Sequence, residues 1–267
     1  MLLAVEYLGK VGVGITMPQF FRADDGNMYV VKLRDTRLEY RVLASELFAA
    51  KIGNVMGLCF PPSDIIEIDE EMVQKNSNLM EQGVIPGQHF ASRYLEQAEY
   101  IGKNRLDKAV NLPEMAGVIL FDHVFHNADR AKNQKNLLFQ PAGDHQYRIY
   151  AIDNSHLFRS SKWTIDTLSN LGSKIKTFYF QHYRTLLKDH LSAQDFIPYL
   201  EVVKTISDKQ IDTIVQEIPA EWLPGAAERQ ALADYAKMRR NMADEIWYTL
   251  CRFIPRSRGG QRWLFAK

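Results

Sequence analysis

The stretch FDHVFHNADRAKNQKNLLF, residues 121–139, decides how the second half of this chain is organised. It begins as the end of an apolar helical pattern and passes into a polar segment that holds an Asp, an Arg and three Asn. It then ends in the three apolar residues at 137–139. Such a segment is either a solvated turn between a helix and a strand or part of a functional site, and its surroundings must distinguish the two.

The sequence on both sides of this stretch predicts a helix before it and a hairpin after it. Residues 111–127 form an apolar run typical of a buried helix, whereas residues 136–155 are two short strand patterns joined by Pro-Ala-Gly-Asp. Helical patterns then follow, and the second half is therefore predicted to be helical with one small hairpin. These helical segments are 164–178, 193–207, 208–218 and 226–250.

The first half of the chain has the short alternating or apolar runs that are typical of strands. An Asp-Gly turn at 23–27 predicts a hairpin, because glycine supplies the positive backbone torsion of tight turns. One helix, at about 40–56 and followed by Gly57, interrupts these strands. The predicted strands are 4–8, 18–23, 28–33, 63–68 and 89–95.

These patterns predict an α+β fold with two lobes. Residues 1–95 form a small antiparallel sheet with one helix, and residues 96–267 form a larger, mainly helical lobe. A short connection near 94–97 joins the two lobes.

Composition excludes several classes of function. The 33 Lys and Arg nearly balance the 32 Asp and Glu, so no broad charge favours nucleic acid or a membrane. Cys59 and Cys251 lack CxxC spacing and are expected to be free thiols in a reducing compartment. No segment has the length and apolar character of a membrane span or signal peptide, so we expect a cytoplasmic protein.

Several residues have the chemistry that phosphoryl transfer from ATP requires, which is a lysine for the phosphates, oxygen ligands for Mg²⁺ and an acid that orients the attacking hydroxyl. Lys32 ends the strand at 28–33 on the face of Val30, and Glu46, beside the apolar stripe of the only predicted helix, could reach it. The alternative for Lys32 is an edge lysine that extends to water.

A loop between the first two strands holds Gly9, Gly12 and Gly14, followed by Thr16. Glycines let backbone amides approach an anion such as a phosphate closely. A hairpin that contains glycines is also common, so this pattern alone is a weak indication.

Asp129, Asn136 and Asp153 are the candidate oxygen-bearing residues. Asp129 and Asn136 precede the predicted hairpin and Asp153 closes it, so the hairpin can bring the three side chains together. Carboxylate and amide oxygens suit Mg²⁺, although capping of a turn is the alternative role for Asp153. His123 and His126 have helical spacing without a third ligand, so we expect structural or surface roles for them.

The ordered set of these segments resembles the HipA-like kinases and, more distantly, the phosphatidylinositol kinases and protein kinases. The resemblance covers nearly the whole chain and implies a kinase fold that binds ATP and Mg²⁺ between two lobes. The matching segments are DDGNMYVVKL at 24–33, ASELFAAKIGNVMGLCFPPSDIIEI at 44–68, NADRAKNQKNLLF at 127–139, YAIDNSHLF at 150–158 and IPAEWLP at 218–224, with an Arg-rich last helix.

The resemblance also implies a role for each candidate residue. Lys32 holds the nucleotide phosphates and Glu46 positions Lys32. Asp129 is the catalytic aspartate, and Asp153 is the magnesium ligand. The remaining implied contacts are the glycine loop over the phosphates, with Gly12, Gly14 and Thr16, and the adenine-proximal residues Tyr94 and Leu95.

The sequence departs from the kinase pattern at the metal-binding Asn, which usually lies five positions after the catalytic Asp. Gln134 occupies that position, with Asn133 one place earlier and Asn136 two places later. Asn136 is preferred because it leads directly into an apolar strand, and Asn133 is the second candidate. Asp-Asn-Ser at 153–155 replaces Asp-Phe-Gly, although the Asp is retained.

Three hypotheses remain at this stage: a kinase, a non-catalytic nucleotide-binding module and a helical interaction protein. For a kinase, family analogy favours a protein Ser or Thr as the phosphate acceptor over a small molecule or lipid. No pattern in the sequence identifies the acceptor.

Overall fold

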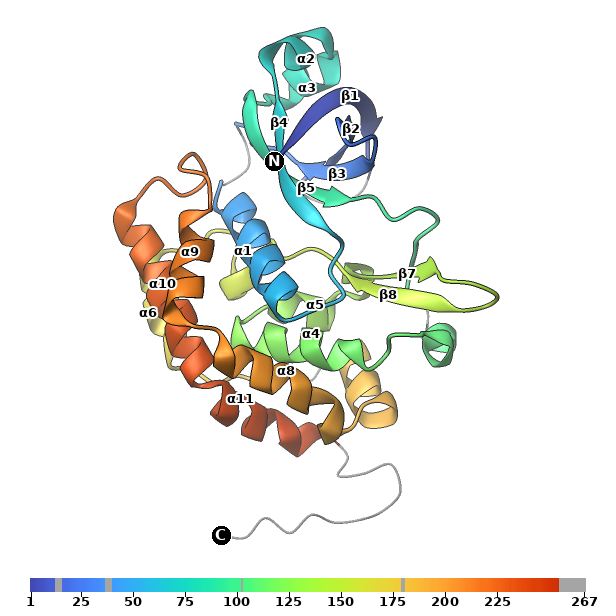
Figure 1. The fold of residues 1–267 in the computed structure, drawn as a ribbon, viewed down its shortest axis with the longest axis vertical. Coiled ribbons are helices and arrows are strands. Elements are labelled where there is room, and N and C mark those ends of the chain that lie inside the picture. The colour runs from blue at the N-terminus through green and yellow to red at the C-terminus, as the bar shows by residue number, and fades with distance from the viewer. Residues whose placement is uncertain (13–15, 37–39, 102, 179–180, 255–267) are drawn as a thin grey trace.

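In the computed structural model of this chain, the described residues are 1–254 without 13–15, 37–39, 102 and 179–180. The fold is α+β, with a strand-rich first part and a helical second part, as predicted (Figure 1).

The five strands of the first part close into a small barrel. Their order is β1-β2-β3-β5-β4, and all neighbours are antiparallel except β1 and β4, which pair in parallel through Leu2 with Ile66 and Leu3 with Glu67. The prediction of a small antiparallel sheet therefore holds for four of the five strand pairings, whereas the parallel pairing of β1 with β4 was not predicted. Strand twist curls the sheet until its edge strands meet and the barrel closes. The strands are β1 (Leu2–Lys10), β2 (Gln19–Ala23), β3 (Met28–Lys32), β4 (Ser63–Ile68) and β5 (Gly87–Arg93).

The predicted Asp-Gly turn joins β2 to β3. Gly26 has φ +79°, and the Ala23 amide donates to the Asn27 carbonyl at 3.0 Å. This turn fixes the register in which Phe20 of β2 pairs with Val30 of β3.

The first part contains three helices rather than one. The predicted helix is α1 (Arg41–Val55), whereas α2 (Glu70–Lys75) and α3 (Ser77–Gln82) lie between β4 and β5. Helices of six residues span fewer than two turns, which is too short for a helical period to stand out in the sequence. Their limits are set by an Asp69 cap and by Gly83 in the left-handed region.

The second part consists of helices around a small three-stranded sheet. The predicted hairpin is β7 (Leu137–Pro141) with β8 (Tyr147–Ala151), and β6 (Glu99–Tyr100) adds a strand beside β7. The helices are α4 (Glu114–Val124), α5 (Ala128–Lys132), α6 (Ile165–Gly172), α7 (Gln181–Thr185), α8 (Ala193–Thr205), α9 (Asp208–Gln216), α10 (Ala226–Asn241) and α11 (Ala243–Leu250). Shorter helical turns are η1 (Lys103–Lys108), η2 (Gln134–Asn136), η3 (Leu157–Arg159), η4 (Leu186–His190) and η5 (Cys251–Phe253).

The last predicted helix is broken into two. Met242 leaves the helical region with ψ near 6°, so that α10 packs against α6 and α9 while α11 packs against α8 and α4. The apolar stripe continues through the break, which explains why the sequence pattern did not reveal it.

Helix α1 connects the two parts of the structure. Most of its buried apolar residues belong to the main core with α4, and the helix also contacts β4 and β5 of the barrel (Figure 1). A second, smaller core fills the barrel. Among the described residues, no helix is long and apolar enough to span a membrane.

Candidate active site

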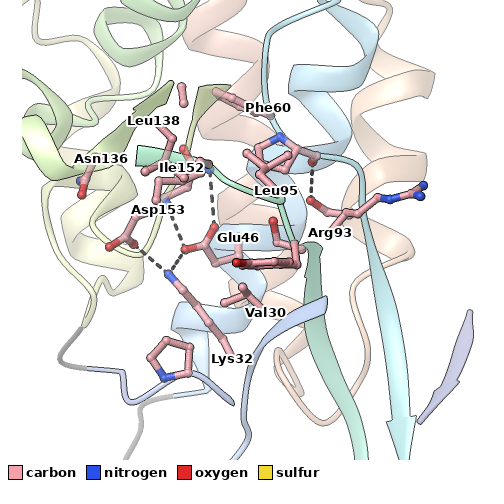
Figure 2. A pocket seen from close by; sticks show the side chains of 18 of the residues that line it. Val30, Lys32, Glu46, Phe60, Arg93, Leu95, Asn136, Leu138, Ile152 and Asp153 are labelled. Atoms are coloured by element: carbon pink, nitrogen blue, oxygen red, sulfur yellow. Dashed lines mark hydrogen bonds and ion pairs between the residues drawn. The ribbon is translucent and has the colours of Figure 1, made fainter. Parts of the chain in front are cut away.

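A cavity of about 580 Å³ lies between the barrel and the helical part (Figure 2). Barrel strands contribute Val30 and Lys32, α1 contributes Glu46, and the β7–β8 hairpin and its flanks contribute Leu138 and Asp153. The walls are mainly apolar, and Lys32, Glu46 and Asp153 lie together at one side of the cavity (Figure 2). This arrangement is suited to a flat ring with a polar tail.

Lys32 lies between two carboxylates in this cavity. Its Nζ forms ion pairs with Glu46 on α1 and, at 2.8 Å, with Oδ1 of Asp153 (Figure 2). Alternation along β3 places Val30 and Lys32 toward the cavity and the fully buried Val31 in the barrel core. The contact between Lys32 and Glu46, which the sequence suggested, is therefore present.

Burial and charge compete at these three groups. Burial acts to lower the pKa of Lys32, but the negative charges of Asp153 and Glu46 outweigh it and raise that pKa. Burial acts to raise the pKa of Asp153, but Lys32 outweighs it and holds the pKa well below its usual range. For Glu46 burial dominates and raises the pKa despite the nearby lysine. Asp153 is consequently ionised at neutral pH.

Asp153 is held in a specific conformation just beyond β8. Its backbone is left-handed, with φ +64°, and its Oδ1 accepts from Lys32 and from the backbone amide and hydroxyl of Ser155. Among the described residues, Oδ2 accepts no hydrogen bond, so one carboxylate oxygen is left for another ligand. Left-handed backbone costs about 1 kcal/mol or more outside glycine, and the contacts of the carboxylate offset it.

Glu46 also binds the turn that carries Asp153. The backbone amide of Asn154 donates to Oε1 of Glu46 at 2.9 Å (Figure 2). Glu46 of α1 therefore contacts the backbone of Asn154 directly, and it contacts the carboxylate of Asp153 through Lys32.

Asp129 lies at the start of α5 and is linked to the cavity by an amide. The side-chain nitrogen of Asn136 donates to Oδ2 of Asp129 at 2.8 Å, and that of Asn133 donates to Oδ1 of Asn136 at 3.0 Å. The Asn136 carbonyl accepts from the Ile152 amide at 3.0 Å, next to Asp153. Asn133 and Asn136 line the cavity, whereas Asp129 and Gln134 are absent from its lining.

Sequence reasoning missed the network around Arg130, the residue after Asp129. The buried guanidinium forms an ion pair with Asp122 of α4 at 3.0 Å and donates to the Ile152 carbonyl and the Asn154 side chain. Arg130 thus fixes α5 to the two residues that flank Asp153. An aspartate within the apolar helix at 111–127 was the available signal, because a buried carboxylate needs a partner.

The other predicted site residues fall into three groups. Thr16, Tyr94 and Leu95 line the cavity, and the Tyr94 amide donates to the Met28 carbonyl at 2.9 Å. Gly12 has φ +81°, as glycine readily allows, but is absent from the lining. Gly14 lies outside the described residues.

The residues present fit a magnesium ion. Asp153 offers an ionised oxygen without a hydrogen bond, and Asn136 brings an amide to the same cavity. Within the described part of the chain, no three His, Cys, Asp or Glu residues cluster as a metal site. Mg²⁺ instead takes one or two protein oxygens together with substrate phosphates and water.

Comparison with known proteins now gives a family. Residues 4–248 match the family model described as HipA-like kinase. No curated protein is matched by sequence.

Two solved structures share the fold at low sequence identity. The proinflammatory kinase CtkA of Helicobacter pylori aligns with a TM-score of 0.59 and 14% identity, over 92% of this chain and 96% of that one. The Golgi casein kinase, solved with Mn and ADP bound, aligns with a TM-score of 0.50 and 10% identity, over 92% of this chain and 72% of that one. These likenesses show a kinase-like fold.

Proposed function

This chain belongs to the HipA-like kinase family and is a kinase, and from that premise we propose that it transfers the γ-phosphoryl group of ATP to a protein Ser or Thr hydroxyl with the help of Mg²⁺. We further propose that residues 1–95 act as the nucleotide-binding lobe and residues 96–267 as the acceptor-binding lobe. The observation that carries the proposal is Lys32, which lies between Glu46 and Asp153 in the cavity.

The nucleotide is proposed to occupy the cavity with its base near Tyr94 and Leu95 and its phosphates near Lys32. The apolar walls support the position of the base. Lys32, which Glu46 and Asp153 hold in the cavity, supports the position of the phosphates because its positive charge attracts them. Gly12, Gly14 and Thr16 are proposed to cover the phosphates from the loop after β1, since a glycine loop allows backbone amides to approach them.

Asp153 and Asn136 are proposed to hold Mg²⁺, with Asn133 as the alternative amide. When bound, Mg²⁺ would neutralise charge on the phosphates during transfer. The role of Asp153 is supported by its low pKa and by the oxygen left without a hydrogen bond. The role of Asn136 is supported by its contacts with both Asp129 and the backbone beside Asp153.

Asp129 is proposed to accept a hydrogen bond from the acceptor hydroxyl and so to aim its oxygen at the phosphorus. A carboxylate in this role gains rate mainly through orientation, with the proton leaving late in transfer. Its position is supported by the Asn136 amide on Oδ2 and by Arg130, which anchors α5.

The test is ATP consumption by the purified full chain with Mg²⁺, together with ATP-induced thermal stabilisation. Asp153→Ala is expected to abolish metal-dependent ATP binding, whereas Asp129→Ala is expected to bind ATP and lose turnover by roughly 10²–10⁴-fold. Asp144→Ala, in the exposed β7–β8 turn, is the matched control and should behave as wild type.

Two results would contradict this proposal. Turnover in Asp129→Ala or Asp153→Ala equal to that of the wild type would remove the assigned roles. Stabilisation by ATP and Mg²⁺ without transfer to protein, lipid or water would favour a nucleotide-binding module instead.

A further inference from the structure

The segment that follows Asp153 carries a local excess of positive charge. Between Ser155 and Leu187 there are five basic residues and one acidic residue, Asp166, in a chain whose charges otherwise nearly cancel. All five basic side chains are exposed and, within the described residues, none of them forms an ion pair. We define the four of them that lie nearest to Asp153 in the sequence as the basic surface: Arg159, Lys162, Lys174 and Lys176.

The basic surface lies beside the helix that carries Asp129. Turn η3, which ends at Arg159, packs directly against α5. The Arg159 amide donates to the His126 carbonyl at 3.1 Å, and Nε2 of His126 donates to the Lys174 carbonyl at 3.0 Å. The backbones of Arg159 and Lys174 therefore both contact His126, three residues before Asp129.

The chain length between His126 and Asp129 limits the distance involved. Three residues span at most roughly 11 Å, which is the reach of about three residues of an extended peptide. A hydroxyl bound at Asp129 would therefore place the neighbouring residues of its own chain within reach of the basic surface.

The backbone that presents these cations is rigid. Phe158 and Arg159 both have left-handed backbones, with φ of 59° and 65°, and the buried Phe158 ring packs against Phe48 and Trp163. Two strained residues in succession persist only where the surroundings hold them. The backbone of Arg159 is consequently held by the buried Phe158 beside it, while the Arg159 side chain is exposed to solvent.

We propose that the basic surface binds the phosphate acceptor and that this acceptor is a protein segment rich in Asp or Glu around its Ser or Thr. The proposal deepens the proposed function and rests on it for the meaning of Asp129. Unpaired cations next to a site attract carboxylates and reject basic peptides, so they select among acceptors.

Nucleic acid is the less favoured occupant of this surface. Proteins that bind nucleic acid depend on many Lys and Arg contacts to phosphates, for example about 6–10 of them. The basic surface offers four cations, and the whole chain has a net charge of only +1. Four cations match a short acidic peptide better.

The test measures binding directly, so that it does not depend on turnover. A fluorescein-labelled peptide of about nine residues, which spans roughly 30 Å when extended, carries a central Ser flanked by Glu. A matched peptide has Gln in place of every Glu, and a single-stranded RNA of equal charge serves as competitor. Fluorescence anisotropy with the full chain gives each affinity at low and high salt.

The variants are Arg159→Glu and the double change Lys174→Glu with Lys176→Glu. Each is expected to weaken binding of the acidic peptide by roughly tenfold, and added salt is expected to weaken it in wild type. Lys209→Glu on α9 is the matched control, because Lys209 is also exposed and forms no ion pair among the described residues. Thermal melting of each variant checks that it is folded.

Three results would overturn this inference: equal binding of the Glu and Gln peptides, unchanged binding in the charge-reversal variants, or tighter binding of the RNA. Failure of the proposed function would be visible separately. In that case ATP with Mg²⁺ would not stabilise the wild type, or Asp153→Ala would leave the stabilisation unchanged. Acidic-peptide binding that Lys209→Glu leaves intact and Lys174→Glu with Lys176→Glu removes would support the inference.

Discussion

The side-chain amide of Asn136 donates a 2.8 Å hydrogen bond to Oδ2 of Asp129, although the two residues are seven positions apart. Turn η2 makes this contact possible, because it folds Asn136 back toward the start of α5. The Asn136 carbonyl also accepts from Ile152, so a single residue connects Asp129 with the strand end that carries Asp153.

This geometry predicts different effects for the three amide residues after Asp129. Asn136→Ala is expected to raise the Mg²⁺ concentration for half-maximal activity by roughly 10–100-fold, since it removes a proposed ligand and a contact to Asp129. Asn133→Ala should have a smaller effect through its hydrogen bond to Asn136. Gln134→Ala, outside the cavity lining, is the control.

Magnesium titrations of ATP turnover separate these cases. If Asn133→Ala shifted the titration more than Asn136→Ala, Asn133 would be the ligand. A large shift for Gln134→Ala would mean that the usual kinase spacing is retained through a different loop conformation.

Removal of the Lys32 charge should make ATP binding depend on pH. Lys32 holds the pKa of Asp153 low, whereas burial acts to raise it, so Lys32→Met is expected to move that pKa upward. Protonated Asp153 cannot serve as an anionic ligand, so binding of ATP with Mg²⁺ should be weaker at about pH 6 than at about pH 8.

Calorimetric titration at the two pH values measures this effect. Lys51→Met changes a partly exposed lysine of the same helix as Glu46, paired with Glu217 away from the cavity, and should retain the wild-type profile. A pH-independent loss of affinity in Lys32→Met would indicate that Lys32 acts only through the phosphates.

The ion pair between Asp122 and Arg130 should contribute strongly to stability. Both side chains have no exposed surface, so Arg130→Met leaves a buried carboxylate without its cation and is expected to cost about 3–5 kcal/mol. For a chain of this size the melting temperature should fall by roughly 10 °C. Arg148→Met, which breaks a partly exposed pair with Glu114, should cost at most about 1 kcal/mol.

A double variant tests whether the charge itself is the cause. Asp122→Leu combined with Arg130→Met removes both charges, so its loss of stability should be smaller than the sum of the single losses. Additive losses in thermal melting would show that the two side chains contribute through packing alone.

His123 should make the fold sensitive to acid. Burial lowers its pKa to about 4, from an ordinary value of 6.5. Between these values the unfolded chain binds more protons than the folded one, so stability falls as pH drops below 6.5, by up to about 1.4 kcal/mol per pH unit. His126, with its pKa lowered by burial to about 3, adds to this effect.

Urea denaturation of the wild type and His123→Gln measures this contribution. Burial raises the pKa values of Glu46 and Asp122, so these two carboxyl groups make stability rise as pH falls, opposite to the effect of His123. Both groups are present in the wild type and in the variant, so the difference between these two proteins isolates His123. The variant should lose less stability than wild type between about pH 7 and pH 5. Identical slopes would show that His123 titrates alike in both states.

Much of the fold could be predicted because it has a local cause. Alternation along the strands, the Asp-Gly turn and the apolar period of α1 are properties of neighbouring residues. Lys32 was identified for the same reason, since a lysine on an apolar strand needs an acidic partner, and Glu46 is that partner. The short α2 and α3 were missed because six residues give no clear period.

The sequence by itself determined the order of the elements, the α+β class and the set of charged residues that a kinase site would use. Only the tertiary structure decided the closure of the barrel, the break at Met242 and the pairing of Arg130 with Asp122. The physical reason is that barrel closure and the break at Met242 depend on contacts between distant segments, which leave no period in the chain. Arg130 and Asp122 are only eight positions apart, but they pair only once α4 and α5 pack together and exclude water. The left-handed backbone of Asp153 is likewise stabilised by Lys32, 121 residues away.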